Sequence, residues 1–231
     1  MPNDSFRPMD VTHGLQFPNE TPEYRAARDA LLREEIELRR HAERVAAQRR
    51  ALPPGGAVKD YLFDSEDGPV KLSDVFEPGK SSLVTYNWMF GPERKESCPS
   101  CAAFLDGLDG AAVHIMQRIN LAVVARSPIK RMVAFKKSRG WRNLRLLSSG
   151  DNTFNADYYA LAPNGAENPM INVFELKRGV LRHCSGSEMF YAPTDPGQDP
   201  RHNGPLDLLW NVFDLTPEGR GTDWRPKLKY S

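Results

Sequence analysis

The chain has 231 residues, enough for one domain with extensions, and its 31 basic and 30 acidic side chains nearly cancel. This balance argues against a protein whose whole surface attracts an oppositely charged partner such as nucleic acid. No apolar run is long enough to cross a membrane, and the first ten residues lack the apolar core of a secretory signal. Three cysteines in a polar chain fit a reducing compartment, so we expect a cytoplasmic protein.

Residues 1–56 are predicted to form an N-terminal arm and a long helical extension. Residues 1–20 show no periodicity and are expected to be an extended or loosely docked arm. Thr21-Pro22 marks a helix start, because it combines a capping hydroxyl with a proline in the first turn. We expect this helix to run to about Arg50, before a proline- and glycine-rich segment.

One apolar stripe runs along this predicted helix, formed by Tyr24, Leu31, Leu38 and Val45 at intervals of seven residues. A long helix that is otherwise highly charged gains most of its stability from packing, so the stripe should be buried. It either lies along its own domain or contacts a second subunit in a homodimer. We favour the homodimer, because the spacing lets two copies pair along their length.

Residues 57–215 are predicted to form one α/β domain. A short strand is expected near 58–63 and a turn at Asp67-Gly68-Pro69, after which 70–76 leads into the central strand. The strongest strand signal is Leu83–Trp88, where β-branched and aromatic residues cluster. A polar loop follows, and the next apolar segment is predicted to be a helix that kinks or restarts at two glycines and ends near Arg118.

The second half of this domain alternates strands and helices. Ile119–Ala125 is a nearly continuous apolar run, as expected for a buried parallel strand. A helix is predicted from Ser127-Pro128 to Gly140, followed by a strand at 143–148. This alternation predicts βαβ units and a mainly parallel core, within a central mixed sheet that is flanked by helices.

The last third of the chain contains a predicted hairpin and a closing helix. Residues 150–168 are rich in turn formers and receive no assignment. Met170–Leu176 and Val180–Ser185 are predicted to be two strands joined by a tight turn. Pro205–Leu215 is predicted to be the last helix, and 216–231 a C-terminal tail.

The motif Cys98-Pro99-Ser100-Cys101 lies where the predicted helix begins, directly after the strand and loop. This is the arrangement of a thioredoxin-like redox site. Side chains three apart in a first helical turn share one face, so the two sulfurs can come within disulfide reach. Backbone N–H groups at the helix start favour a thiolate at Cys98, and we predict that Cys101 resolves the mixed disulfide.

Two other interpretations of the CxxC motif are half of a zinc site and a pair of inert core cysteines. A zinc site needs four ligands, but the third cysteine, Cys184, stands alone beside His183. Neighbours on a strand point to opposite faces, so both would rarely bind one metal. We therefore expect no metal and no cofactor. Cys184 itself is interpreted as a buried core thiol or as a third redox partner.

Between residues 111 and 150 the chain carries nine basic side chains and no acid. They are Arg118, Arg126, Lys130, Arg131, Lys136, Lys137, Arg139, Arg142 and Arg145. A solvated helix face with loop ends is the simplest interpretation. The alternative is a basic surface for an anionic partner. Nucleic acid is disfavoured, because Phe135 and Trp141 are the only aromatic residues there that could stack on bases.

The predicted order of strands and helices resembles that of thioredoxins. Asn168-Pro169, just before an apolar strand, resembles the segment in which thioredoxins place a cis-proline. The resemblance implies a cis Asn168–Pro169 bond close to Cys98 and Cys101. It also implies that Pro169 shapes a groove for an extended substrate. The residues expected to contact that substrate are Pro169, Asn168, Pro99 and Ser100.

The chain also resembles the DUF899 family of thioredoxin-like proteins, which are described as predicted dithiol–disulfide oxidoreductases. The matching blocks are the 24–50 helix with Arg49-Arg50-Ala51-Leu52-Pro53, Met89-Phe90-Gly91-Pro92, Cys98-Pro99-Ser100-Cys101, Asp109-Gly110, Phe135-Lys136-Lys137, Gly140-Trp141, Asp214-Leu215-Thr216-Pro217-Glu218-Gly219-Arg220 and Asp223-Trp224. The resemblance implies a thiol–disulfide oxidoreductase that acts on a protein or small-molecule disulfide.

Three departures from ordinary thioredoxin affect what the resemblance implies. The central dipeptide is Pro-Ser, the strand 83–88 carries no aspartate, and the loop before Cys98 is longer and charged. The redox potential of thioredoxin is therefore not carried over. Two other functions stay open. One is a non-catalytic binding module of the same fold with a basic surface, and the other is a thiol peroxidase in which Arg94 or Arg126 hydrogen-bonds the cysteine.

Overall fold

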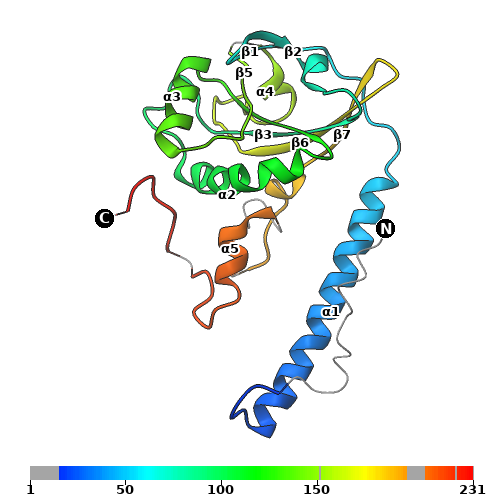
Figure 1. The fold of residues 1–231 in the computed structure, drawn as a ribbon, viewed down its shortest axis with the longest axis vertical. Coiled ribbons are helices and arrows are strands. Elements are labelled where there is room, and N and C mark those ends of the chain that lie inside the picture. The colour runs from blue at the N-terminus through cyan, green and yellow to red at the C-terminus, as the bar shows by residue number, and fades with distance from the viewer. Residues whose placement is uncertain (1–15, 151, 197–205, 222, 231) are drawn as a thin grey trace. The chain divides into compact units, whose positions relative to one another are not determined.

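Figure 1 shows the computed structural model, which describes residues 16–150, 152–196, 206–221 and 223–230. The chain divides into two units, Met1–Leu52 and Pro53–Ser231. Most of the predicted N-terminal arm lies outside the described residues, as does the beginning of the predicted last helix. Among the residues described, no helix is both long enough and apolar enough to cross a bilayer.

The first unit contains the helix α1, Pro22–Arg50, and the predicted helix is confirmed. The side chain of Thr21 caps it by accepting the backbone N–H of Tyr24 at 3.2 Å. All residues of α1 are described and none of them is buried; Leu31 is 50% and Leu38 69% exposed. The packing of the apolar stripe therefore stays a prediction.

The second unit is built on one mixed sheet of seven strands, within the part of the chain that the structure describes. The strands are β1 (Leu62–Ser65), β2 (Gly68–Lys71), β3 (Ser82–Asn87), β4 (Asn120–Ala125), β5 (Leu146–Ser148), β6 (Met170–Lys177) and β7 (Val180–Gly186). Their order is β2-β1-β5-β4-β3-β6-β7. The neighbours β3, β4 and β5 run parallel, and the remaining pairs are antiparallel. This order, with the CxxC helix after β3, confirms the predicted thioredoxin-like α/β fold.

The helices of the second unit connect and cover these strands (Figure 1). They are α2 (Pro99–Ile115), α3 (Ile129–Arg139), α4 (Phe154–Asp157), α5 (Leu208–Phe213) and the 3₁₀ helices η2 (Leu72–Val75) and η3 (Glu188–Phe190). The predicted restart of this helix is wrong, because α2 continues through Gly107 and Gly110 and ends at Ile115. The predicted last helix is shorter than expected, and part of the predicted tail packs on it through Trp224 and Trp210.

Two apolar cores lie on the two faces of the sheet, and β4 contributes to both. Leu121, Val123 and Ala125 pack with α2 and α3, whereas Ala122 and Val124 pack with η2 and α4. Successive side chains of a strand point to opposite faces, so a strand covered on both faces needs a continuous apolar run. This explains the apolar run that predicted β4 from sequence.

An apolar cavity of about 820 Å³ lies between α2, the sheet and α5. Its lining includes Tyr86 of β3, Phe104 of α2 and Phe213 of α5. Tyr86 also belongs to the same apolar core as Cys101. Tyr86 therefore lines the cavity and packs in the core that contains the second cysteine of the motif.

Asp109 fastens α2 to the segment that leads into β5, and we expect Asp109→Ala to destabilise the protein. The buried Asp109 carboxylate accepts the backbone N–H groups of Arg142, Asn143 and Leu144 at 2.8–3.1 Å. Removing it leaves three donors without their acceptor, at a cost of about 2–4 kcal/mol in the free energy of unfolding. Urea denaturation measures this change. The control Asp64→Ala, at an exposed position of β1, should stay within about 0.5 kcal/mol of wild type. Equal effects of the two variants would contradict the prediction.

Candidate functional site

The two cysteines of the motif lie where the loop after β3 enters α2. Cys98 occupies the N-cap position of α2 without a capping bond from its side chain, and Pro99 follows it in the first turn. The carbonyl of Cys98 accepts the backbone N–H of Ala102 at 3.0 Å. Both cysteines are free thiols. Cys101 is fully buried, whereas Cys98 is partly exposed.

The pKa of the Cys98 thiol is lowered to about 6. The largest cause is a hydrogen bond from the Cys101 side chain, and the backbone N–H groups of Cys101 and Ser100 also donate to the sulfur. The positive charge of Arg94 acts in the same direction, whereas burial opposes it. At neutral pH, Cys98 is therefore mainly the nucleophilic thiolate.

The pKa of Cys101 moves the opposite way, well above that of an ordinary thiol. Burial is the largest cause, and the hydrogen bond to Cys98 adds to it because the proton stays on Cys101. A hydrogen bond from Tyr86 partly offsets this rise. The two sulfurs thus differ in exposure and in protonation, which separates an attacking thiolate from a protonated resolving thiol.

Cys184 lies on β7, away from this pair. It is partly exposed, so its interpretation as a buried core thiol is wrong. Burial of its sulfur still raises its pKa. The neighbouring ring of His183 lies 3.0 Å from Asn172 Oδ1 through its Nε2. No group of three or more potential metal ligands gathers within the described residues.

The predicted cis bond at Asn168–Pro169 is wrong. No peptide bond among the described residues is cis. Asn168 is held by its backbone N–H, which donates to the Ala160 carbonyl at 3.0 Å, and Pro169 is buried. The residue before a proline favours an extended backbone, and a trans bond continues that backbone directly into β6. Met170, the first residue of β6, pairs with Asn87, the last residue of β3. Pro169 therefore lies at the same end of the sheet as the loop that leads from β3 to the cysteines.

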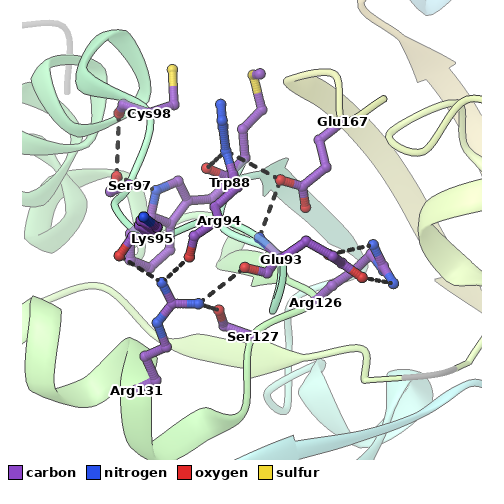
Figure 2. A network of polar contacts seen from close by, with 12 residues as sticks. Trp88, Glu93, Arg94, Lys95, Ser97, Cys98, Arg126, Ser127, Arg131 and Glu167 are labelled. Carbon is purple, nitrogen blue, oxygen red and sulfur yellow. Dashed lines mark hydrogen bonds and ion pairs between the residues drawn. The ribbon is translucent and has the colours of Figure 1, made fainter. Parts of the chain in front are cut away.

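The loop before Cys98 is fastened by a network of polar contacts, shown in Figure 2. Arg131 of α3 donates to the carbonyls of Gly91 and Lys95 and to the Ser127 hydroxyl, each at 3.0 Å. It also donates to the carbonyl of Arg94. Arg131 therefore holds the loop that delivers Cys98, a role that its place in a basic stretch did not indicate.

Other members of the basic stretch are paired as well. Arg126 forms two hydrogen bonds with Glu93 at 3.3 Å, and Arg139 pairs with Asp106. Lys136 lies 3.0 Å from a carboxylate oxygen of Glu66. These contacts leave less positive charge for an anionic partner than the sequence alone suggested.

Glu167 is a site residue that the sequence analysis missed. Its Oε2 atom accepts the backbone N–H of Gly91 at 3.1 Å and lies 3.4 Å from Arg94 Nε (Figure 2). Glu167 falls in the segment that received no assignment. The available signal was an acidic residue directly before Asn168-Pro169, the segment that the resemblance to thioredoxins placed near the cysteines.

A search of curated proteins found no match. Similar solved structures include a peroxiredoxin-like protein from Aquifex aeolicus, at 12% identity over 59% of this chain and 75% of that one, with a TM-score of 0.44. Another is peroxidoxin BcpB from Mycobacterium tuberculosis, at 18% identity over 58% of this chain and 86% of that one, with a TM-score of 0.45. No activity is carried over from these low-identity likenesses. A family model described as "Bacterial protein of unknown function (DUF899)" matches residues 15–230, so the chain belongs to the DUF899 family.

Proposed function

We propose that this protein is a thiol–disulfide oxidoreductase with Cys98 as nucleophile and Cys101 as resolving thiol. The observation that carries the proposal is the contrast between the two sulfurs. Cys98 is partly exposed with a pKa lowered to about 6, whereas Cys101 is buried with a raised pKa. A reactive dithiol needs this division between an accessible thiolate and a protected thiol.

In the proposed reaction, the Cys98 thiolate attacks one sulfur of a protein or small-molecule disulfide. The other substrate sulfur leaves as a thiolate and takes up a proton. Cys101 then loses its proton and attacks the Cys98 sulfur, which releases the second substrate thiol. The products are a Cys98–Cys101 disulfide and a substrate reduced by two electrons. A second thiol reductant returns the enzyme to its dithiol form.

Substrate contacts are proposed at Pro99, Ser100, Asn168 and Pro169. Pro99 is exposed and Ser100 partly exposed directly beside Cys98, which supports a contact with the group bonded to the attacked sulfur. Asn168 is partly exposed, whereas Pro169 is buried. The proposed role of Pro169 is therefore to shape the end of the sheet against which the substrate binds.

Brief alkylation of the reduced protein tests this proposal. We expect iodoacetamide to label Cys98 first at neutral pH, with Cys101 and Cys184 much slower, because only Cys98 has a lowered pKa. The labelling rate should persist as the pH falls from 8 and drop only as it passes through about 6, where the thiolate takes up a proton. Mass spectrometry of the peptides assigns the labelled residue. Fastest labelling at Cys184 would contradict the proposal.

A thiol peroxidase is the second candidate, and Arg94 is the observation that favours it. Its charge stabilises the Cys98 thiolate, whereas the other arginine considered, Arg126, is engaged by Glu93. The thiolate would attack the O–O bond of a hydroperoxide to give a sulfenic acid and an alcohol. Cys101 would then displace water from the sulfenic acid to form the disulfide. Faster formation of the Cys98–Cys101 disulfide with a hydroperoxide than with a disulfide would favour this candidate.

A further inference from the structure

Glu167 places a carboxylate in a buried position beside the loop that leads to Cys98. Its side chain is 8% exposed. Oε2 contacts both Gly91 and Arg94, whereas Oε1 has no hydrogen-bond partner among the described residues. Burying a carboxylate costs free energy unless the carboxylate is paired, so acidic side chains are rarely this buried without a partner. The pairing with Arg94 and Gly91 is therefore a specific feature of this site.

Gly91 is fitted to this carboxylate. A Cβ atom at position 91 would lie 2.6 Å from Glu167 Oε1 and 3.0 Å from Glu93 Oε2. These distances are shorter than van der Waals contact, so a larger residue at position 91 would displace the Glu167 carboxylate from its place against the loop. The close approach allows the Gly91 N–H to donate to Oε2.

Arg94 connects Glu167 to Cys98 through one backbone carbonyl. Arg94 Nε donates to the oxygen of Met89 at 3.3 Å, and the backbone N–H of Cys98 donates to the same oxygen at 3.3 Å. Arg94 is 35% exposed and lies on a loop, so its long side chain would lose this position without a partner. Glu167 is the acidic partner that the structure gives it.

We propose that Glu167 is a positioning residue of the dithiol site, which holds the Arg94 guanidinium beside Cys98 and fastens the loop at Gly91. Glu167 acts through Arg94 and need not touch the substrate. The inference rests on the proposed role of Cys98 as the nucleophile.

The charges around Cys98 and Glu167 determine in which direction the pKa of Cys98 changes when Glu167 is removed. Cys98 faces Cys101 and Arg94, whereas Glu167 faces Arg94, Arg126 and Glu93. If Glu167 acted only through its own negative charge, its removal would lower the pKa of Cys98, because a nearby anion disfavours a thiolate. If it holds Arg94 in place, its removal releases the cation and raises that pKa. The two mechanisms therefore shift the pH profile in opposite directions.

The experiment measures the pH midpoint of Cys98 alkylation in the full chain. We expect Glu167→Ala to raise the midpoint by about one pH unit, the low end for loss of an adjacent opposite charge, because Arg94 is partly exposed. Labelling at pH 6 then slows about fivefold. Arg94→Gln should give the same shift, and the double variant should give no more than either alone. Glu167→Gln keeps an acceptor for the Gly91 N–H and should shift the midpoint less.

Glu93→Gln is the matched control, since Glu93 is exposed in the same loop and pairs with Arg126 instead of Arg94. It should leave the midpoint unchanged. Circular dichroism shows whether each variant is folded. If Glu167→Ala is unfolded, a double-mutant cycle of Arg94→Gln and Glu167→Gln is measured instead. An unchanged or lowered midpoint, or additive shifts in the cycle, would overturn the inference. A wild type in which Cys98 labels no faster than Cys184 would overturn the proposed function instead.

Discussion

Replacing Cys98 by serine is expected to abolish thiol–disulfide exchange. A serine hydroxyl stays protonated at neutral pH, so the variant lacks the thiolate that the lowered pKa of Cys98 provides. The rate of disulfide reduction should fall at least about a thousandfold, as when other enzymes lose their nucleophile. The measurement is reduction of glutathione disulfide, or of insulin as a protein disulfide, with excess dithiol as the final reductant.

Replacing Cys101 by serine should have a different effect, because Cys98 can still attack. Without a resolving thiol, the reaction stops at the mixed disulfide, which intact-mass measurement detects as one substrate thiol added to the chain. Cys184→Ser is the control and should retain turnover, since Cys184 lies apart from the pair on β7. Turnover in Cys98→Ser, or its loss in Cys184→Ser, would contradict the assignment of the nucleophile.

Local signals predicted most of the fold and the place of the two cysteines at the start of α2. A continuous apolar run identified β4 because both faces of that strand are covered, and the Thr21-Pro22 cap identified the start of α1. The CxxC motif with its proline indicated the start of α2, because proline suits the first turn of a helix. In each case, the residues that cause the structure are neighbours in sequence.

The parts that the sequence did not predict depend on contacts between distant segments. Gly91 and Glu167 are 76 residues apart, and nothing in either local sequence indicates that they meet. The two glycines in α2 suggested a break, since each costs about 1 kcal/mol in a helix. Packing of Leu105 and Ala112 in the core, with the bonds of Asp109, holds the helix together instead. Tertiary contacts therefore outweigh the local preference.

The basic stretch illustrates the same limit for charge. Counting side chains from 111 to 150 gave an unopposed positive surface, but acids outside the stretch pair with several of its members, as Glu66 does with Lys136. Arg131 is directed inward to backbone carbonyls of the loop before Cys98. A local charge count therefore overstated the unpaired positive charge of this stretch and missed that Arg131 holds the loop before Cys98.

The apolar stripe of α1 leads to the second large expected effect, on oligomeric state. The helix spans 29 residues, and Tyr24, Leu31 and Leu38 are each at least half exposed. Burying one such side chain stabilises a contact by about 1.5–3 kcal/mol. Two helices paired along the stripe would bury several of these side chains from each copy, so the gains would add up. The seven-residue spacing keeps the stripe on one face along the helix, as pairing requires. We therefore expect a homodimer through α1.

Replacing Leu31 and Leu38 together by aspartate should convert this dimer into a folded monomer. Pairing the helices would then bury four carboxylates, two from each copy. Burying unpaired charges costs several kcal/mol, which is more than the free energy gained by burying Tyr24 and Val45. The control Ala26→Asp with Ala47→Asp adds the same charge at exposed positions off the stripe and should remain dimeric. Light scattering gives the mass of each variant, and circular dichroism shows whether the fold is kept. A wild type that stays monomeric at high concentration would exclude the dimer. The stripe would then have to be covered by a contact within its own chain.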